Sequence, residues 1–346
     1  MKVKKSLIIG LFLAFLPFTA KAQNNGFTRA QVLKYTGISA AISVLTITEI
    51  GFIDSTDVEN FRLPWWFYGT IFSQHLPLYS LNSKRALYYS GAELGFLGLH
   101  LASQENKFLT EVPMNYYLKT AFYSTYDIYK EARTNAKPGV YPENWKTYGL
   151  GELFVAPFKW KNLSHPLFYI PIILTNVGNV LSAPDEEDAI WKTGEAYIDD
   201  KEVPRNQAVA AVFAQKLISM TATAIGEEAL YRGVIYEEMK VSWGPWLAKI
   251  FDMVLFPLIH VPYDLVRGAS SEEITNNFIV RSVSTLLFDF AYDKGGLPLS
   301  VTLHTWFNTI SMTYDWAATS GVKSSSSNGN GASIMPPLTI GFSVKF

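Results

Sequence analysis

The chain alternates between long apolar stretches and polar connecting segments. The apolar stretches have the length of helices, are rich in Ala, Leu and Gly, and lack the period of two that marks a strand. They cover residues 35–53, 64–80, 86–103, 166–182, 207–225, 246–262, 278–290 and 297–316. In lipid, every backbone polar group must be paired within the chain, which favours helices. We therefore predict an all-α fold, a polytopic transmembrane bundle of about seven or eight helices, in which 64–80 and 278–290 could instead be re-entrant or half-buried.

The first 22 residues have the pattern of an export signal. Lys2, Lys4 and Lys5 precede the apolar run 7–18, and Ala20-Lys21-Ala22 supplies the small-x-small pattern of a cleavage site. The run is shorter than the roughly 20 residues that a spanning helix needs. We predict a signal peptide over 1–22 and a mature chain that begins near Gln23; the alternative is an uncleaved first span.

The last 30 residues, 317–346, form a predicted tail. A Ser/Gly/Asn-rich linker covers 324–331, and after Pro336-Pro337 the apolar positions 338, 340, 342, 344 and 346 alternate with polar or small ones. Period two predicts a short β-strand with one apolar face. A terminal strand that ends in Phe is also typical of outer-membrane barrels, but we favour an edge strand or a strand that docks a partner.

The polar segments divide the remaining chain. We predict N-terminal membrane helices and polar loops over 23–205 and a catalytic membrane domain over 206–316. In the connection between residues 106 and 161, the stretch 116–133 carries many tyrosines. Tyrosine favours the membrane interface, so this stretch is either a helix that lies at the interface or an ordinary packed helix.

Composition supports a membrane environment and excludes several kinds of site. Only 17% of the 346 residues are charged, against about 25% in average soluble proteins. The net charge of -1 offers no basic surface for nucleic acid. The chain has no cysteine, which excludes disulfides, thiolate metal ligands and a cysteine nucleophile.

The first group of residues that could carry chemistry follows the apolar run 207–225. Glu227 and Glu228 are adjacent, and Glu228 and Arg232 are one helical turn apart, so those two can pair on one face. Charged side chains in lipid are costly and usually functional. The alternative is a surface pair at a helix end.

Two further groups lie within later apolar runs. Phe256 is followed four residues later by His260, and His304 by Asn308. A buried imidazole needs a hydrogen-bond partner and can accept a proton or bind a metal. His304 and Asn308 share one helical face and could both donate to a developing oxyanion. Structural histidines and polar contacts between helices are the alternatives.

Taken together and in this order, the three groups resemble the CPBP family, which includes the type II CAAX prenyl endopeptidases and the Abi proteins. The family pattern is EExxxR, then FxxxH, then HxxxN or HxxxD. This chain has Glu227-Glu228-xxx-Arg232, then Phe256-xxx-His260, then His304-xxx-Asn308. The resemblance covers about residues 207–316 and includes Gly295-Gly296-Leu297 ahead of the third motif.

The resemblance implies an intramembrane endopeptidase with a polar cavity inside a helical bundle. Glu227 and His260 would activate a water, His304 and Asn308 would stabilise the oxyanion, and Glu228 would hold the site together with Arg232 and Phe256 as structural support. Relatives have been described both as zinc metalloproteases and as metal-independent glutamate proteases. Glu227, His260 and His304 could together bind zinc with an open position for water. Because HExxH is absent, we favour a mechanism without metal.

The expected partners are a peptide or protein substrate and the lipid bilayer, with no nucleic acid. We expect a multi-pass protein of the bacterial inner membrane. Two other readings stay open: a catalytically silent membrane scaffold or immunity-type binding protein, and an exported protein associated with the outer membrane. No residue pattern identifies the substrate.

Overall fold

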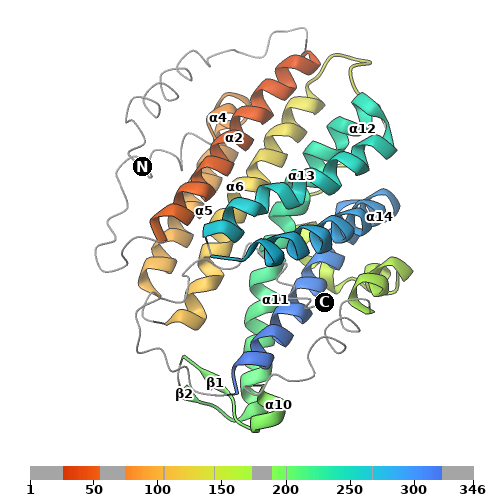
Figure 1. The fold of residues 1–346 in the computed structure, drawn as a ribbon. Coiled ribbons are helices and arrows are strands. Elements are labelled where there is room, and N and C mark those ends of the chain that lie inside the picture. Colours follow the sequence, from red (N-terminus) through yellow and green to blue (C-terminus); the bar gives the residue numbers. More distant parts are fainter. Residues whose placement is uncertain are drawn as a thin grey trace.

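The computed structural model describes residues 26–54, 75–103, 106–143, 145–173, 189–199, 201–266 and 268–321. The predicted signal peptide and the predicted C-terminal strand lie outside these residues. The described part is a helical bundle, which confirms the all-α class (Figure 1). Its helices are α2 (Arg29–Asp54), α4 (Leu76–Leu81), α5 (Ser83–Ala102), α6 (Lys107–Thr134), α7 (Leu150–Val155), α8 (Trp160–Leu163), α10 (Ile190–Thr193), α11 (Arg205–Leu230), α12 (Glu237–Trp243), α13 (Pro245–Val266) and α14 (Ser271–Thr319).

Shorter elements connect these helices. A 3₁₀ turn, η2 (Ala156–Phe158), joins α7 to α8, and a π-helical segment, η3 (Tyr231–Tyr236), joins α11 to α12. Strands β1 (Tyr197–Ile198) and β2 (Lys201–Glu202) form an antiparallel pair in the connection between α10 and α11. This pair and α10 lie at one end of the bundle, away from α13 (Figure 1).

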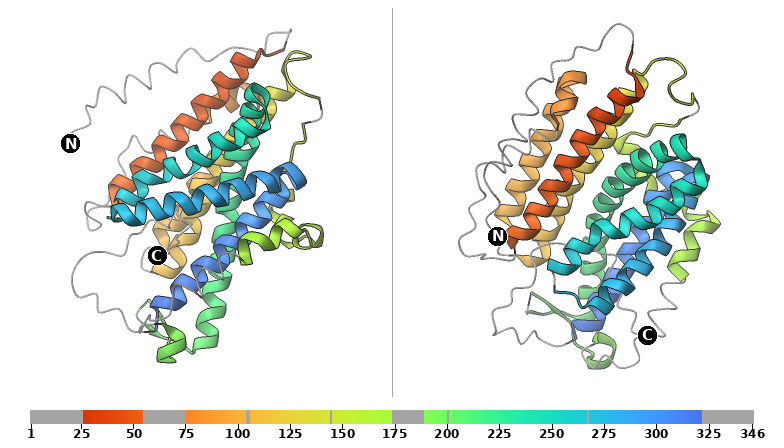
Figure 2. Two further views of the ribbon diagram at one scale, coloured as in Figure 1. Left: turned by 45° about the vertical axis from the view of Figure 1, so that its right-hand side comes forward. Right: turned by 45° about the horizontal axis from the view of Figure 1, so that its top comes forward.

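Helix α6 packs against α2, α5 and α11, and the views show it between α2 and α11 (Figure 2). Its N-terminus is capped by Asn106, whose side chain accepts a hydrogen bond from the backbone N–H of Leu109. The tyrosines of the stretch 116–133 face the protein interior, since Tyr117, Tyr126 and Tyr129 are at most 2% exposed. The packed-helix reading of this stretch is therefore confirmed, and the reading as an interface helix is wrong.

Two glycines let α6 approach α11 and η3 closely. A Cβ at Gly226 would lie 2.6 Å from the Cβ of Lys119, and one at Gly233 would lie 2.7 Å from the ring of Tyr126. The two glycines are seven residues apart, about two helical turns, and so share one face. This close crossing places the backbone of α6 beside the Glu227-Glu228 pair.

The π-helical segment begins three residues after that pair and contains Arg232. An extra residue in a helical turn changes the direction in which the following side chains point, and such segments occur often at functional sites. Here Arg232 is fully buried and points into the bundle.

Helix α14 contains a break at Gly296. This residue has φ +69°, and a Cβ there would lie 2.0 Å from the hydroxyl oxygen of Tyr148. Only glycine fits, because other residues disfavour positive φ and have a side chain that would clash. The break separates the two predicted runs 278–290 and 297–316, and it explains the Gly295-Gly296 pair ahead of the third motif.

Two stretches of the described residues are long and apolar enough to cross a membrane: Arg205–Trp243, which comprises α11, η3 and α12, and Pro245–Pro262 in α13. The prediction of seven or eight spanning helices is not confirmed. Helix α13 presents an apolar face outward, since Leu247, Ile250, Val254 and Leu258 are each at least half exposed. An apolar stripe of this kind on the outside of a bundle is typical of contact with lipid.

Candidate active site

The Glu228 carboxylate is buried and accepts hydrogen bonds from three side chains. Arg232 Nη1 lies 3.2 Å from Glu228 Oε1, which confirms the predicted i, i+4 pair. The same oxygen lies 2.7 Å from Nδ1 of His304, and the Ser300 hydroxyl donates to the other oxygen. Helix α14 therefore brings His304 to the motif on α11, as expected for a single site.

Arg232 is held by two further carboxylates and by two aromatic rings. Its Nε lies 3.1 Å from Asp289 Oδ1 and 3.5 Å from Asp252 Oδ2. The guanidinium carbon lies 5.1 Å from the ring centroid of Phe256 and 5.5 Å from that of Phe288. A buried guanidinium needs such partners because an unpaired charge in the interior is very costly.

Glu227 points away from Glu228 and meets α6. The Lys119 ammonium donates to Glu227 Oε1, and both side chains are at most 4% exposed. On the other side, Nε2 of His304 lies 3.8 Å from Glu227 Oε2. His304 therefore stands between the two carboxylates, with one ring nitrogen on each side.

His260 reaches the same region from α13. Its Nδ1 lies 2.6 Å from the backbone carbonyl oxygen of Phe256, one turn earlier. A carbonyl only accepts hydrogen bonds, so Nδ1 carries a proton and Nε2 of the neutral ring is an acceptor. The buried imidazole lies within electrostatic reach of Glu227. The ring of Phe256 packs on the imidazole at 4.6 Å between centroids.

Asn308 follows His304 by one turn of α14 and is 3% exposed. Among the described residues, its Oδ1 and Nε2 of His304 have no hydrogen-bond partner. Buried polar atoms without partners are rare in folded proteins and often mark a place where a ligand or water binds.

The proposed zinc site does not fit this arrangement. Within the described residues, no three His, Asp or Glu side chains are grouped closely enough to hold a metal ion. Of the three expected ligands, Glu227 already pairs with the Lys119 ammonium. A cation at Glu227 would have to displace that ammonium or lie beside it, which like charge disfavours.

Sequence reasoning missed several residues of the site. They are Lys119, Asp252, Asp289 and Ser300. Asp252 and Asp289 each interrupt an apolar run, and that alone is a signal of function in a membrane segment. Ser300 lies one turn before His304 on the same face. Lys119 offered no comparable signal, because it occurs in a polar, tyrosine-rich stretch of ordinary composition.

Comparison with known families shows which family shares this group of residues. Residues 209–310 match the sequence model of the type II CAAX prenyl endopeptidase Rce1-like family. The match supports the resemblance of this segment to the CPBP family of proteases. The CPBP segment, residues 209–310, contains all three motifs, from Glu227 to Asn308.

No curated protein and no solved structure matches the chain. The family match begins at residue 209, after α6 has ended, so it does not include the helix that carries Lys119. The CPBP segment supports a membrane protein with peptidase ancestry, and the reacting groups must be argued from the contacts described above.

Proposed function

We propose that the protein is an intramembrane endopeptidase that hydrolyses a peptide bond with a water activated by Glu227. The observation that carries this proposal is the meeting of α6, α11 and α14 at one buried carboxylate, with His260 of α13 packed on Phe256, which contacts Arg232 of the same cluster. Glu227 pairs with Lys119, lies 3.8 Å from His304 Nε2, and is within electrostatic reach of His260.

In the first step Glu227 takes a proton from the attacking water. The Oε1 atom is engaged by Lys119, which leaves Oε2 for the water. His260 presents the acceptor nitrogen Nε2 because its Nδ1–H is donated to Phe256, so it can accept the second proton of the same water as a hydrogen bond. Two acceptors orient the water for attack on the carbonyl carbon.

The carbonyl oxygen gains negative charge as the tetrahedral intermediate forms. We assign its stabilisation to His304 and Asn308. Glu228 accepts from Nδ1–H of His304, so when the ring is an imidazolium its second proton, on Nε2, points away from Glu228 and can be donated to the oxyanion. The amide of Asn308 supplies a second donor one turn later. Preorganised donors of this kind are among the largest single contributions to catalysis.

The intermediate then collapses and the peptide C–N bond breaks. Glu227 returns its proton to the leaving amine, so the carboxylate is regenerated and no group is consumed. Glu228 and Arg232 do not touch the substrate in this scheme. They position His304, since Glu228 accepts from the imidazole while Arg232 compensates its charge.

The test is cleavage of a proteome-derived peptide library by the purified protein in detergent, with products mapped by mass spectrometry. Glu227→Gln is nearly isosteric but cannot take a proton. We expect it to lower cleavage by a factor on the order of 10²–10⁴, the usual contribution of general acid–base catalysis.

Glu202→Gln is the matched control, because Glu202 is an exposed glutamate on β2. It should cleave as the wild-type protein does. Cleavage by Glu227→Gln at the wild-type rate would end the assignment of Glu227 as the base, and equal thermal unfolding midpoints would exclude a folding defect.

For the location of the protein, we propose the inner membrane of a bacterial cell. The outward apolar stripe of α13 supports a helical bundle in lipid. After separation of inner and outer membranes, the protein should be recovered with the inner fraction. Recovery with the outer membrane would contradict this placement.

A further inference from the structure

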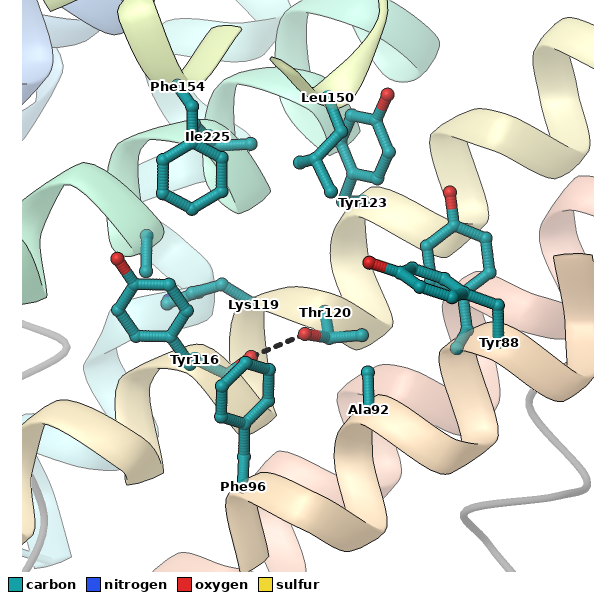
Figure 3. Close-up of a pocket in the computed structure, with 12 residues that line it drawn as sticks. Tyr88, Ala92, Phe96, Tyr116, Lys119, Thr120, Tyr123, Leu150, Phe154 and Ile225 are labelled. Carbon is teal, nitrogen blue, oxygen red and sulfur yellow. Dashed lines mark hydrogen bonds between the residues drawn. The ribbon is translucent and has the colours of Figure 1, made fainter. Parts of the chain in front are cut away.

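A pocket lies beside Lys119, and most of its wall comes from helices outside the CPBP segment. Helices α5, α6 and α7 form three of its sides, and α11 closes the fourth (Figure 3). We call α5, α6 and α7 the front helices. The lining residues are Tyr88, Tyr89, Ala92, Phe96, Tyr116, Lys119, Thr120, Tyr123, Leu150, Phe154, Ala222 and Ile225.

Aromatic rings form most of the wall. The rings of Phe96 and Tyr116 lie 5.2 Å apart between centroids, and Tyr116 stacks on Phe154 at 6.0 Å. Tyr88 is 65% exposed and so lies at the mouth, whereas Tyr123 is buried. The labelled side chains surround an open space in the close-up (Figure 3).

Apart from Tyr88 at the mouth, the polar side chains of the wall have partners in the protein. The Thr120 hydroxyl donates to the Tyr116 carbonyl oxygen at 2.6 Å, and the Tyr89 hydroxyl donates to Asp127 at 3.2 Å. The Lys119 ammonium is paired with Glu227. What the pocket offers a ligand is therefore apolar surface, and a polar ligand would gain no hydrogen bond to compensate for its lost water.

The volume of the pocket limits the size of that ligand. The cavity measures about 130 Å³. An engineered apolar cavity of about 150 Å³ binds benzene. The pocket thus fits one side chain of the size of Phe, Leu or Met, whereas a long lipid chain would extend well beyond it.

Lys119 connects this pocket to the candidate base. Its stem lines the pocket while its ammonium reaches Glu227, so one lysine side chain separates the two. Ile225, also in the wall, precedes Glu227 by two residues on α11. Since an extended peptide advances about 3.3–3.6 Å per residue, a side chain in the pocket would belong to a residue within a few positions of the bond at Glu227.

We propose that this aromatic pocket is a specificity subsite that receives one large apolar side chain of the peptide substrate, close to the scissile bond. The inference rests on the proposed endopeptidase function. It adds the class of substrate residue that the protein recognises, which that function does not specify. The subsite is built mainly by the front helices, with Ala222 and Ile225 of α11 closing it, so most of the residues that would select the substrate lie outside the CPBP segment.

The test compares cleavage sites in the proteome-derived peptide library. Wild-type protein should show Phe, Leu and Met enriched at one position flanking the cleaved bond. Ala92→Phe places a ring in the pocket. We expect it to lower the preference for large over small residues at that position at least tenfold, within the range for one apolar pocket.

Gly91→Leu is the matched control, because Gly91 is the adjacent residue on α5, exposed and with open space at its Cβ position. It should keep the wild-type preference. Phe154→Ala provides a second variant that enlarges the pocket, and it should extend the preference to Trp. This variant keeps the test decisive if Ala92→Phe does not fold.

The outcomes separate the two proposals. If cleavage depends on Glu227 but the residue preference is unchanged in both Ala92→Phe and Phe154→Ala, the subsite alone is overturned. This result is expected if a lipid chain fills the pocket. Wild-type cleavage no greater than that of Glu227→Gln would overturn the endopeptidase and the subsite together. A preference that changes in the pocket variants and not in Gly91→Leu supports the subsite.

Discussion

The CPBP segment and the front helices differ in how their polar groups are used. In the CPBP segment, carboxylates of α11, α13 and α14, the His304 imidazole and the Arg232 guanidinium of η3 are buried and bind one another. In the front helices, aromatic rings surround a pocket, and the Thr120 hydroxyl in its wall is bonded within α6. One region is organised to hold charge, and the other to bind apolar groups. Lys119 is the point where the second region contributes a charge to the first.

The strongest test of this difference is removal of the central charge in the CPBP segment. Arg232→Met leaves Glu228, Asp252 and Asp289 without their shared cation. Breaking a buried ion pair in this way costs about 3–5 kcal/mol, so the thermal unfolding midpoint in detergent should fall markedly. Arg205→Met, at the exposed start of the same helix, should leave the midpoint unchanged. Equal midpoints for the two variants would show that the cluster is not what stabilises the segment.

The second test removes a proposed oxyanion donor and leaves the charges in place. Asn308→Ala should lower kcat on the order of 10²–10³-fold, the effect of losing one such donor. The unfolding midpoint should change little, because the Oδ1 atom of Asn308 has no hydrogen-bond partner among the described residues. Turnover on the peptide library within twofold of wild type would remove Asn308 from the mechanism.

The third test addresses Lys119, which lies in the front helices but contacts the base. Lys119→Met keeps the length of the side chain and the wall of the pocket while removing the ammonium. We expect kcat to fall about 10- to 100-fold, because a hydrogen bond between charged groups contributes about 1.5–3 kcal/mol. The KM should change less, since the apolar stem that faces the pocket is retained.

The control for this variant is Lys130→Met on the same helix. Lys130 Nζ lies 2.5 Å from Asp127 Oδ1, and this pair is remote from the candidate active site. It should retain wild-type kcat. If Lys119→Met changed KM and left kcat unaltered, Lys119 would belong to substrate binding alone, and its contact with Glu227 would have no catalytic part.

The smallest expected effect concerns the contact between the two regions. Gly226→Ala places a methyl group against the backbone of Lys119, which forces α6 and α11 apart. Overpacking of this kind typically costs about 1–3 kcal/mol, visible as a lower unfolding midpoint. Gly98→Ala, with open space at the Cβ position, should lose none. An unaltered midpoint in Gly226→Ala would mean that the two regions tolerate separation.

The sequence predicted the motif residues of the candidate site better than the residues that contact them. Glu228 and Arg232 lie one turn apart, and helical periodicity alone dictates their pairing. The contact of Glu228 with His304 spans 76 residues and needed the family resemblance to be expected. Lys119 is 108 residues from Glu227, on a helix that the resemblance does not cover. No local sequence pattern predicts that α6 crosses α11 at this point, although Gly226 lies where the two helices cross.

The helical class was predictable for similar physical reasons, because apolar runs of helix length without alternation leave few other structures. The position of the break in α14 was foreshadowed by Gly295-Gly296. The location of the tyrosines in 116–133 was not predictable, because a tyrosine has an apolar ring and one polar hydroxyl and is therefore suited both to a membrane interface and to a protein interior. Only the packing of α6 against its neighbours decides between them.

The break in α14 at Gly296 is a point of contact between the CPBP segment and the segment that leads into the front helix α7. The hydroxyl of Tyr148 occupies the place where a side chain of residue 296 would be, and Tyr148 stands two residues before Leu150 in the pocket wall. The break in α14 is therefore packed against the segment that leads into α7. Because α14 also carries His304, a side chain at residue 296 would displace Tyr148 and disturb both the entry to the pocket wall and the helix that positions the imidazole.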